Sequence, residues 1–246
     1  MVRAFIALAL ATQAALAIPV RWPEGTLRGF PVVRDRNGDL LANSSLSQWL
    51  ERGNLRVKVV HTFRDGRRIE EQAEMKQDSE LQQLRWSFVE QSGESVLRRF
   101  EVDFETGSAT AEKLQNGELK HWKEALSIER GRTFSGSGFL YAVKNLRQRL
   151  HAGDRIQLTA IAFTPKPRTA TVTVFFDQVD KLTMGGRSFE ADRFTIHPEI
   201  PFIARPFVKA PDQRLWFFTE SPPGLLRFEG PLAEPYDPII HIDVIP

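Results

Sequence analysis

Apolar and polar residues alternate along most of the chain with a period of two, which is the spacing of a strand with one buried face. In residues 55–63 (LRVKVVHTF), Val57 and Phe63 belong to the apolar side and Lys58 to the polar side. The dipeptide Asp65-Gly66 follows, and such dipeptides adopt the positive φ angles of a tight hairpin turn. The sequence therefore predicts a β-hairpin here.

Similar turn dipeptides recur about every eight to twelve residues, which is typical of an antiparallel meander. They are Asn37-Gly38, Arg52-Gly53, Thr106-Gly107, Asn116-Gly117 and Gly185-Gly186. Counting the alternating segments between them, we expect about twelve strands.

One segment has helical periodicity instead. Between residues 138 and 151, apolar residues repeat at i, i+4, i+7 and i+11, as Phe139, Val143, Leu146 and Leu150. Ser137 is expected to cap the amino end of this helix and Gly153 its carboxyl end. The apolar stripe needs a packing partner, and the sheet is the only large one.

These elements predict a mainly β protein. The expected architecture is a strongly curved antiparallel sheet, a half-barrel or open barrel, with one central helix covering its concave face. No Gly/Ser linker, charge block or fixed-period repeat divides the chain, so residues 18–246 are expected to form a single domain.

The first 17 residues predict a signal peptide. Arg3 supplies the positive charge, residues 4–11 are apolar, and Ala15-Leu16-Ala17 matches a cleavage site, so Ile18 would begin the mature chain. A short membrane anchor is the alternative, but the apolar run is well below the ~20 residues of a bilayer span. We expect no transmembrane segment in the mature chain.

Composition narrows the function further. The chain has no cysteine, so disulfides, thiol nucleophiles and thiolate metal sites are excluded. An exported protein without disulfides fits the bacterial periplasm. The formal net charge is +2 and the charged residues are interleaved, whereas a nucleic-acid-binding protein needs a basic stripe.

Residues suited to catalysis or metal binding are sparse. The five histidines include no H-E-x-x-H motif. His61 shares the apolar side of its strand and is expected to be buried and hydrogen-bonded. His197 has Asp192 and Glu199 close in sequence, which leaves a minor catalytic or metal-binding alternative. Residues 35–39 (DRNGD) are similar to the start of a calcium-binding loop, but the glycine comes one position too early, so a plain turn is expected.

Nucleophile and nucleotide motifs are also missing from the sequence, which has no G-x-S-x-G, P-loop or dinucleotide fingerprint. We therefore predict no catalytic residue, no metal site and no cofactor. A cofactor-free hydrolase centred on His61 or His197 is the least favoured class.

Aromatic residues carry the strongest signal. In residues 215–218 (LWFF), Leu215 and Phe217 would lie on one face and Trp216 and Phe218 on the other, so both faces need cover. Either these rings fill the core between helix and sheet, or some line a cavity for an apolar ligand, with the loop 198–211 at its mouth. The candidate ligand-binding residues are Phe139, Val143, Phe175, Phe202, Phe207, Trp216 and Phe218.

Four segments resemble a group of exported bacterial proteins related to a secreted domain of unknown function. They are EGTLRGFPVVRDRNGDLLA, VVHTFRDGRRIEE, AFTPKPR and LWFFTESPPGLLRFEGPL. Known relatives of that domain resemble the periplasmic lipoprotein carriers (LolA-like proteins). The resemblance implies a half-barrel whose concave side takes acyl chains, and it assigns no individual residue.

Two hypotheses follow. The first is a periplasmic, non-enzymatic protein that binds a lipid or another hydrophobic small molecule in the concave face of its sheet. The second is an envelope protein-interaction or scaffold module with a filled core, which docks through an edge strand or the proline-spaced loop.

Overall fold

The structure is a computed structural model, and it describes residues 17–200 and 210–244. These residues form sixteen strands and one helix, α1 (Gly138–His151). The strands are β1 (Leu27–Gly29), β2 (Val32–Arg34), β3 (Leu40–Glu51), β4 (Asn54–Phe63), β5 (Arg67–Gln77), β6 (Leu81–Ser92), β7 (Ser95–Asp103), β8 (Ser108–Gln115), β9 (Glu118–Ala125), β10 (Thr133–Phe134), β11 (Ile156–Phe163), β12 (Pro167–Met184), β13 (Arg187–Pro198), β14 (Gln213–Phe218), β15 (Leu225–Pro231) and β16 (Ile239–Asp243).

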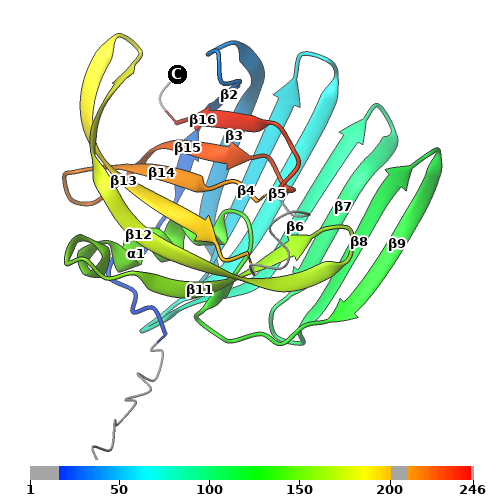
Figure 1. The fold of residues 1–246 in the computed structure, drawn as a ribbon, viewed down its shortest axis with the longest axis horizontal. Coiled ribbons are helices and arrows are strands. Elements are labelled where there is room, and N and C mark those ends of the chain that lie inside the picture. The colour runs from blue at the N-terminus through cyan, green and yellow to red at the C-terminus, as the bar shows by residue number, and fades with distance from the viewer. Residues whose placement is uncertain (1–16, 201–209, 245–246) are drawn as a thin grey trace, which may run out of the picture.

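All described strands belong to one sheet, in the order β10-β11-β12-β13-β14-β15-β16-β2-β3-β4-β5-β6-β7-β8-β9, with β1 beside β3. Neighbours are antiparallel except for β10 and β11. Within the described chain, β9 and β10 are the two edges of this sheet and are not paired with each other. The sheet therefore curls without closing, and the predicted mainly β, half-barrel class is confirmed (Figure 1).

The predicted turns are confirmed, but the predicted number of strands is wrong. Each of the turn dipeptides separates two strands, and Gly66, for example, has the positive φ of 86° that a tight turn requires. The structure has sixteen strands instead of about twelve. Three of the strands, β1, β2 and β10, have only two or three residues each. Such short strands leave no alternation to detect in the sequence.

The helix begins and ends at the predicted residues, and its apolar stripe packs into the core that covers the concave face. Val143 is fully buried and Leu146 is 2% exposed. At the carboxyl end, Ala152 is the cap residue, and Gly153 follows it with a φ of 95°.

The amino end of α1 is stabilised by a carboxylate from the sheet rather than by a local cap. The Ser137 side chain makes no capping hydrogen bond, but its backbone N–H donates to Glu71 Oε1 at 2.7 Å. Trp86 Nε1 donates to the same oxygen at 2.8 Å. Gly136 lies so close that a Cβ there would come within 2.2 Å of Trp86 Nε1. A negative charge at a helix amino terminus is favourable, so Glu71 fixes the helix on the sheet.

Four aromatic rings join the two arms of the curved sheet. Phe163, at the end of β11, lies 4.5 Å from the ring of Phe100 and 5.6 Å from that of Trp86. Phe88 stacks on Phe100 at 5.6 Å. Because Phe163 comes from one arm and the other rings from β6 and β7, this stack holds β11 across the concave face (Figure 1).

The two aromatic faces of β14 are covered by different elements. Leu215 and Phe217 belong to the main core, together with α1. Trp216 belongs to a second apolar cluster on the other face, with Met184, Ala191 and Leu226, flanked by Leu182, Phe189 and Phe218. Most of these residues come from the distal half of the β12–β13 hairpin. The chain itself thus covers the second face of the LWFF segment.

The segment that follows the predicted cleavage site is an integral part of the fold. Ile18 is 1% exposed, and its carbonyl accepts a hydrogen bond from the Leu81 backbone N–H at 2.8 Å. Further on, Asn145 Oδ1 of the helix accepts the backbone N–H groups of Arg21 and Trp22. In the described part of the chain, no helix has the length and apolar content to cross a bilayer.

Candidate functional site

Three neighbouring strands carry a charged residue on the apolar, concave face of the sheet. Glu90 of β6 lies opposite Arg98 of β7, and Arg98 lies opposite Lys113 of β8. Two positions along from Glu90 and Arg98 are the phenylalanines of the aromatic stack, Phe88 and Phe100. Strand alternation therefore directs these three charges into the concavity, at one end of the aromatic stack.

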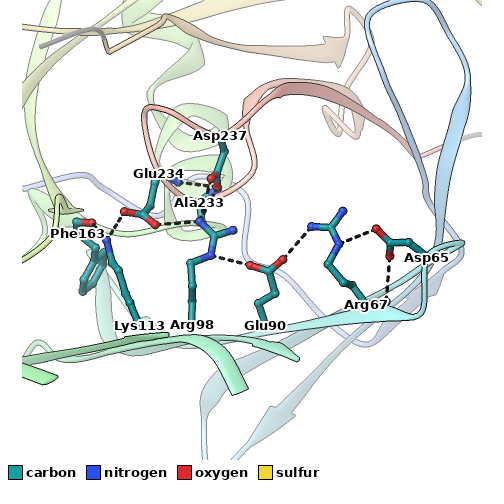
Figure 2. A network of polar contacts seen from close by, with 9 residues as sticks. All are labelled: Asp65, Arg67, Glu90, Arg98, Lys113, Phe163, Ala233, Glu234 and Asp237. Atoms are coloured by element: carbon teal, nitrogen blue, oxygen red, sulfur yellow. Dashed lines mark hydrogen bonds and ion pairs between the residues drawn. The ribbon is translucent and has the colours of Figure 1, made fainter. Parts of the chain in front are cut away.

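Arg98 is the centre of a rim network that consists of Asp65, Arg67, Glu90, Arg98, Lys113, Glu234 and Asp237 (Figure 2). Its Nε donates to Glu90 Oε2 at 2.6 Å, and its Nη1 donates to Glu234 Oε2 and Asp237 Oδ1, both at 2.9 Å. Glu234 and Asp237 belong to the loop between β15 and β16. The guanidinium group therefore ties this loop to β6 and β7 across the concave face.

The neighbours of Arg98 extend the rim network on both sides. Lys113 donates to the backbone oxygen of Phe163 at 2.7 Å and forms an ion pair with Glu234. Arg67 donates to Glu90 Oε1 at 2.9 Å. The network thus joins β5–β8, the end of β11 and the β15–β16 loop, three parts of the chain that lie far apart in the sequence.

Every charge in the rim network has a partner of opposite sign. Burial alone would lower the pKa of Arg98, but the carboxylates of Asp237, Glu90 and Glu234 together raise the pKa above its ordinary value. A network whose charges are all paired offers no free acid, base or nucleophile. We interpret it as a structural latch.

His61 is buried and hydrogen-bonded, as the sequence predicts. It is 3% exposed, and its Nδ1 lies 2.6 Å from Ser44 Oγ, which is itself buried. Burial lowers the pKa of His61 to about 4, so the ring is neutral at neutral pH. A serine–histidine contact is a requirement of one class of hydrolase, but neither side chain is accessible to a substrate.

The residues around His197 do not form one cluster. His197 Nδ1 lies 2.7 Å from Asp212 Oδ1 on an exposed part of the sheet. Glu199 accepts a hydrogen bond from Thr173 instead. Asp192, on the other face, binds Arg147 and His151 of the helix and is 2% exposed.

No metal centre emerges from these residues either. Over the described ranges, no group of three His, Asp or Glu side chains is arranged to hold a metal ion. Asp35 Oδ1 accepts the backbone N–H groups of Asn37 and Asp39, so the DRNGD segment is the plain turn that was expected.

The five predicted ligand-binding residues that the structure describes lie in different parts of the fold. Phe139 and Val143 are buried in the main core, and Trp216 and Phe218 lie in the second cluster. Phe175 is half-buried, with the Arg155 guanidinium 4.0 Å above its ring. Phe202 and Phe207 lie outside the described residues. A ligand-binding role for these seven residues stays a prediction.

A groove with a volume of about 680 Å³ lies on the outer, convex face of β3–β8. We call it the outer groove. Its lining comprises Trp49, Glu51, Arg56, Val57, Gln72, Ala73, Glu74, Arg85, Trp86, Ser87, Glu101, Val102, Asp103, Ser108 and Thr110. Its volume falls within the roughly 300–1,000 Å³ of typical ligand sites.

Two rows of directly opposed residues build this groove. One row runs across six strands as Trp49, Arg56, Glu74, Arg85, Asp103 and Ser108. The next row contains Gln72, Ser87, Glu101 and Thr110. The short hydroxyl side chain of Ser87 lies between the longer side chains of Gln72 and Glu101, which leaves the face hollowed at that point.

Some charges of the outer groove are paired within the protein and others are not. Arg56 binds Glu51 at 3.0 Å and Glu74 at 2.7 Å. In contrast, the side chains of Arg85 and Glu101 are exposed and form no hydrogen bond or ion pair within the described chain. The outer groove therefore holds polar groups that are free to bind a ligand.

Sequence reasoning missed both the rim network and the outer groove. A signal for the first was present, because Glu90, Arg98 and Lys113 each occupy an apolar position of an alternating strand. Charged residues at apolar positions of three consecutive strands indicate charges that are buried and paired with each other. The outer groove left a weaker signal, the serine and threonine residues on the polar side of β6 and β8.

Comparisons with known proteins assign neither a family nor a function to the chain. No protein-family model and no curated protein matches the chain. One solved structure, described as a β-barrel-like protein of the domain of unknown function DUF1849 from Brucella abortus, is similar over 90% of this chain and 96% of its own. The identity is 11% and the TM-score 0.43, and no argument is built on this likeness. The more specific resemblance to lipoprotein carriers stays a prediction.

Replacing Arg98 with methionine tests the structural role of the rim network. The substitution keeps a similar length but leaves Glu90, which is 3% exposed, without its main cation. We expect the free energy of unfolding to fall by about 3–5 kcal/mol in urea titrations. Arg99→Met is the matched control, because Arg99 is 40% exposed and has one ion pair at 3.5 Å; its expected change is below about 1 kcal/mol. Equal, small losses in both variants would contradict the latch.

The buried His61 predicts a pH-dependent stability. Its pKa in the folded state, about 4, lies below the ordinary 6.5, so unfolding takes up a proton between these two values. The contribution of the neutral His61 ring to the free energy of unfolding is complete above pH 6.5 and is lost as the pH falls toward 4. Between about pH 8 and pH 5, we expect a loss of roughly 2 kcal/mol in the free energy of unfolding. His61→Gln should remove this part of the dependence, and an unchanged pH profile in that variant would refute the assignment.

Proposed function

We propose that the protein is an exported, non-enzymatic binding module whose binding site is the outer groove. The observation that carries this proposal is the pair of unpaired, oppositely charged side chains, Arg85 and Glu101, in an open groove of about 680 Å³. Free charges inside a concave surface are typical of a recognition site. The proposal belongs to the interaction-module class, with the docking surface on the sheet face instead of at an edge strand.

The state of the concave face supports this choice. Helix α1, the aromatic stack and the rim network occupy it, and the side chains that meet there are almost fully buried, such as Val143, Phe100 and Leu146. A protein that already fills its concave face needs another surface for a partner.

Export with cleavage after Ala17 is part of the proposal. It is supported by the leader-like composition of residues 1–17 and by the absence of cysteine from the whole sequence. It is also supported by the burial of Ile18, since a mature chain that begins there keeps the contacts with β6.

Site-directed photo-crosslinking in a bacterial host tests the proposal. The full chain is produced with a benzophenone-bearing residue in place of Ser87, which lines the outer groove, or of Ser95, an exposed serine at the β6–β7 turn that serves as the control. We expect a defined adduct from position 87 only. Intact mass of the periplasmic protein should place its first residue at Ile18. Equal adducts at both positions, or none, would count against the outer groove.

A second candidate is the binding of a lipid or acyl chain in the concave face. The observation that favours it is the row of aromatic rings Trp86, Phe88 and Phe100 on this face. Phe163 covers these rings in the structure, so a bound acyl chain would have to take the place of Phe163. Organic extraction of protein purified without detergent, followed by mass spectrometry, should then release a stoichiometric lipid. An extract without lipid from folded protein would contradict this candidate, and it would not contradict the proposal of a binding site in the outer groove.

A further inference from the structure

The charges of the outer groove restrict what it can bind. Arg56 is neutralised by Glu51 and Glu74, and Asn54 donates to the second oxygen of Glu74 at 2.8 Å. The charges left over are the cation Arg85 and two carboxylates of β7. The lining thus holds four carboxylates (Glu51, Glu74, Glu101 and Asp103) against two guanidinium groups (Arg56 and Arg85), a formal charge of −2, so an anionic ligand is opposed.

The two carboxylates left over are Glu101 and Asp103, and they differ in their surroundings. Asp103 Oδ1 accepts the backbone N–H groups of Thr106 and Glu105, and these hydrogen bonds, assisted by the nearby charge of Arg85, lower the pKa of Asp103. The side chain of Thr106 adds a further hydrogen bond to this carboxylate. The outer groove thus presents carboxylate acceptors from β7 beside a guanidinium donor from β6.

A ligand that suits such a surface must both donate and accept hydrogen bonds at short intervals. Guanidinium groups only donate and carboxylates only accept, whereas a hydroxyl group does both. The hydroxyl groups of Ser87, Ser108 and Thr110 add further sites of either kind to the outer groove. A neutral molecule with many hydroxyl groups can therefore satisfy every free group in it.

The tryptophan at one end of the groove adds a second requirement. Trp49 is 37% exposed although it is a large aromatic residue, and it begins the cross-strand row that ends at Ser108. An exposed indole ring binds flat C–H surfaces. Sugar rings combine C–H faces with hydroxyl groups around their edge. The row crosses six strands, roughly 24 Å at ~4.8 Å per strand, which is long enough for several linked sugar rings.

We infer that the outer groove binds a neutral oligosaccharide chain, with one ring stacked on Trp49 and hydroxyl groups bound by Arg85, Glu101 and Asp103. This inference rests on the proposed function of the outer groove and adds the chemical class of its ligand. It uses side chains that the fold leaves free, and it requires no movement of the sheet.

Calorimetric titration of the mature protein with defined hexasaccharides (cellohexaose, chitohexaose and maltohexaose) tests the inference, with hexalysine as a cationic comparison. We expect at least one hexasaccharide to bind. Trp49→Ala and Arg85→Ala should each weaken that binding at least about tenfold. Both side chains are exposed, so neither substitution removes core packing. Arg36→Ala, at an exposed turn between β2 and β3, is the control and should leave binding unchanged.

The other outcomes separate this inference from the proposed function. Binding of hexalysine alone, or a crosslinked protein at position 87 with no saccharide binding, would overturn the saccharide and keep the outer groove as the site. Saccharide binding that survives both substitutions would place the sugar elsewhere and overturn the inference. Neither saccharide binding nor a position-specific crosslink would overturn both.

Discussion

The curvature of this sheet depends on contacts that cross its concave face. Hydrogen bonding between neighbouring strands gives the sheet its order, but the two edges, β9 and β10, are not paired with each other. The stack of Phe163 on Phe100 and Trp86, and the ion pairs of Arg98, bring strands from distant parts of the chain together. Backbone pairing alone would leave an open sheet free to flatten, whereas these contacts hold it curled.

The contacts across the concave face are of two kinds, the aromatic stack and the ion pairs of the latch, and these respond differently to their surroundings. The aromatic stack is favourable wherever water is excluded. The buried charges are favourable only when each one has its partner, because removing them from water is costly. Asp237 Oδ2 accepts the backbone N–H groups of Ala233 and Glu234, so the loop is already shaped when it meets Arg98 (Figure 2). This makes the position of the loop specific, since a displaced loop would leave several buried charges unpaired.

Filling the concave face has a consequence for function. With α1, the aromatic rings and the latch on the inner side, the free polar groups of the sheet lie on its outer side. Alternation then places Arg85, Glu101 and Trp49 together on that side, because each points away from the core. The same strands thus form a closed apolar interior and an open polar groove.

The sequence alone determined the local structure of this protein. The helix at 138–151, the turn glycines, the mainly β class and the burial of His61 all follow from periodicity and backbone conformation within short windows. These features need only neighbouring residues, and they could be predicted for that reason. The helix cap was an exception, because the carboxylate of Glu71 comes from a strand 66 residues away.

Only the tertiary structure decided which distant residues meet. Alternation states which face a residue occupies but not what lies opposite that face. Arg98 therefore gave no hint of Glu234 or Asp237, which lie 136 and 139 residues further along the chain. The outer groove, likewise, spans residues from Trp49 to Thr110 and exists only because six strands stand in one register. The register and the curvature of the sheet result from many contacts between residues far apart in the sequence. A short window of sequence does not contain both partners of such a contact, so it cannot predict either feature.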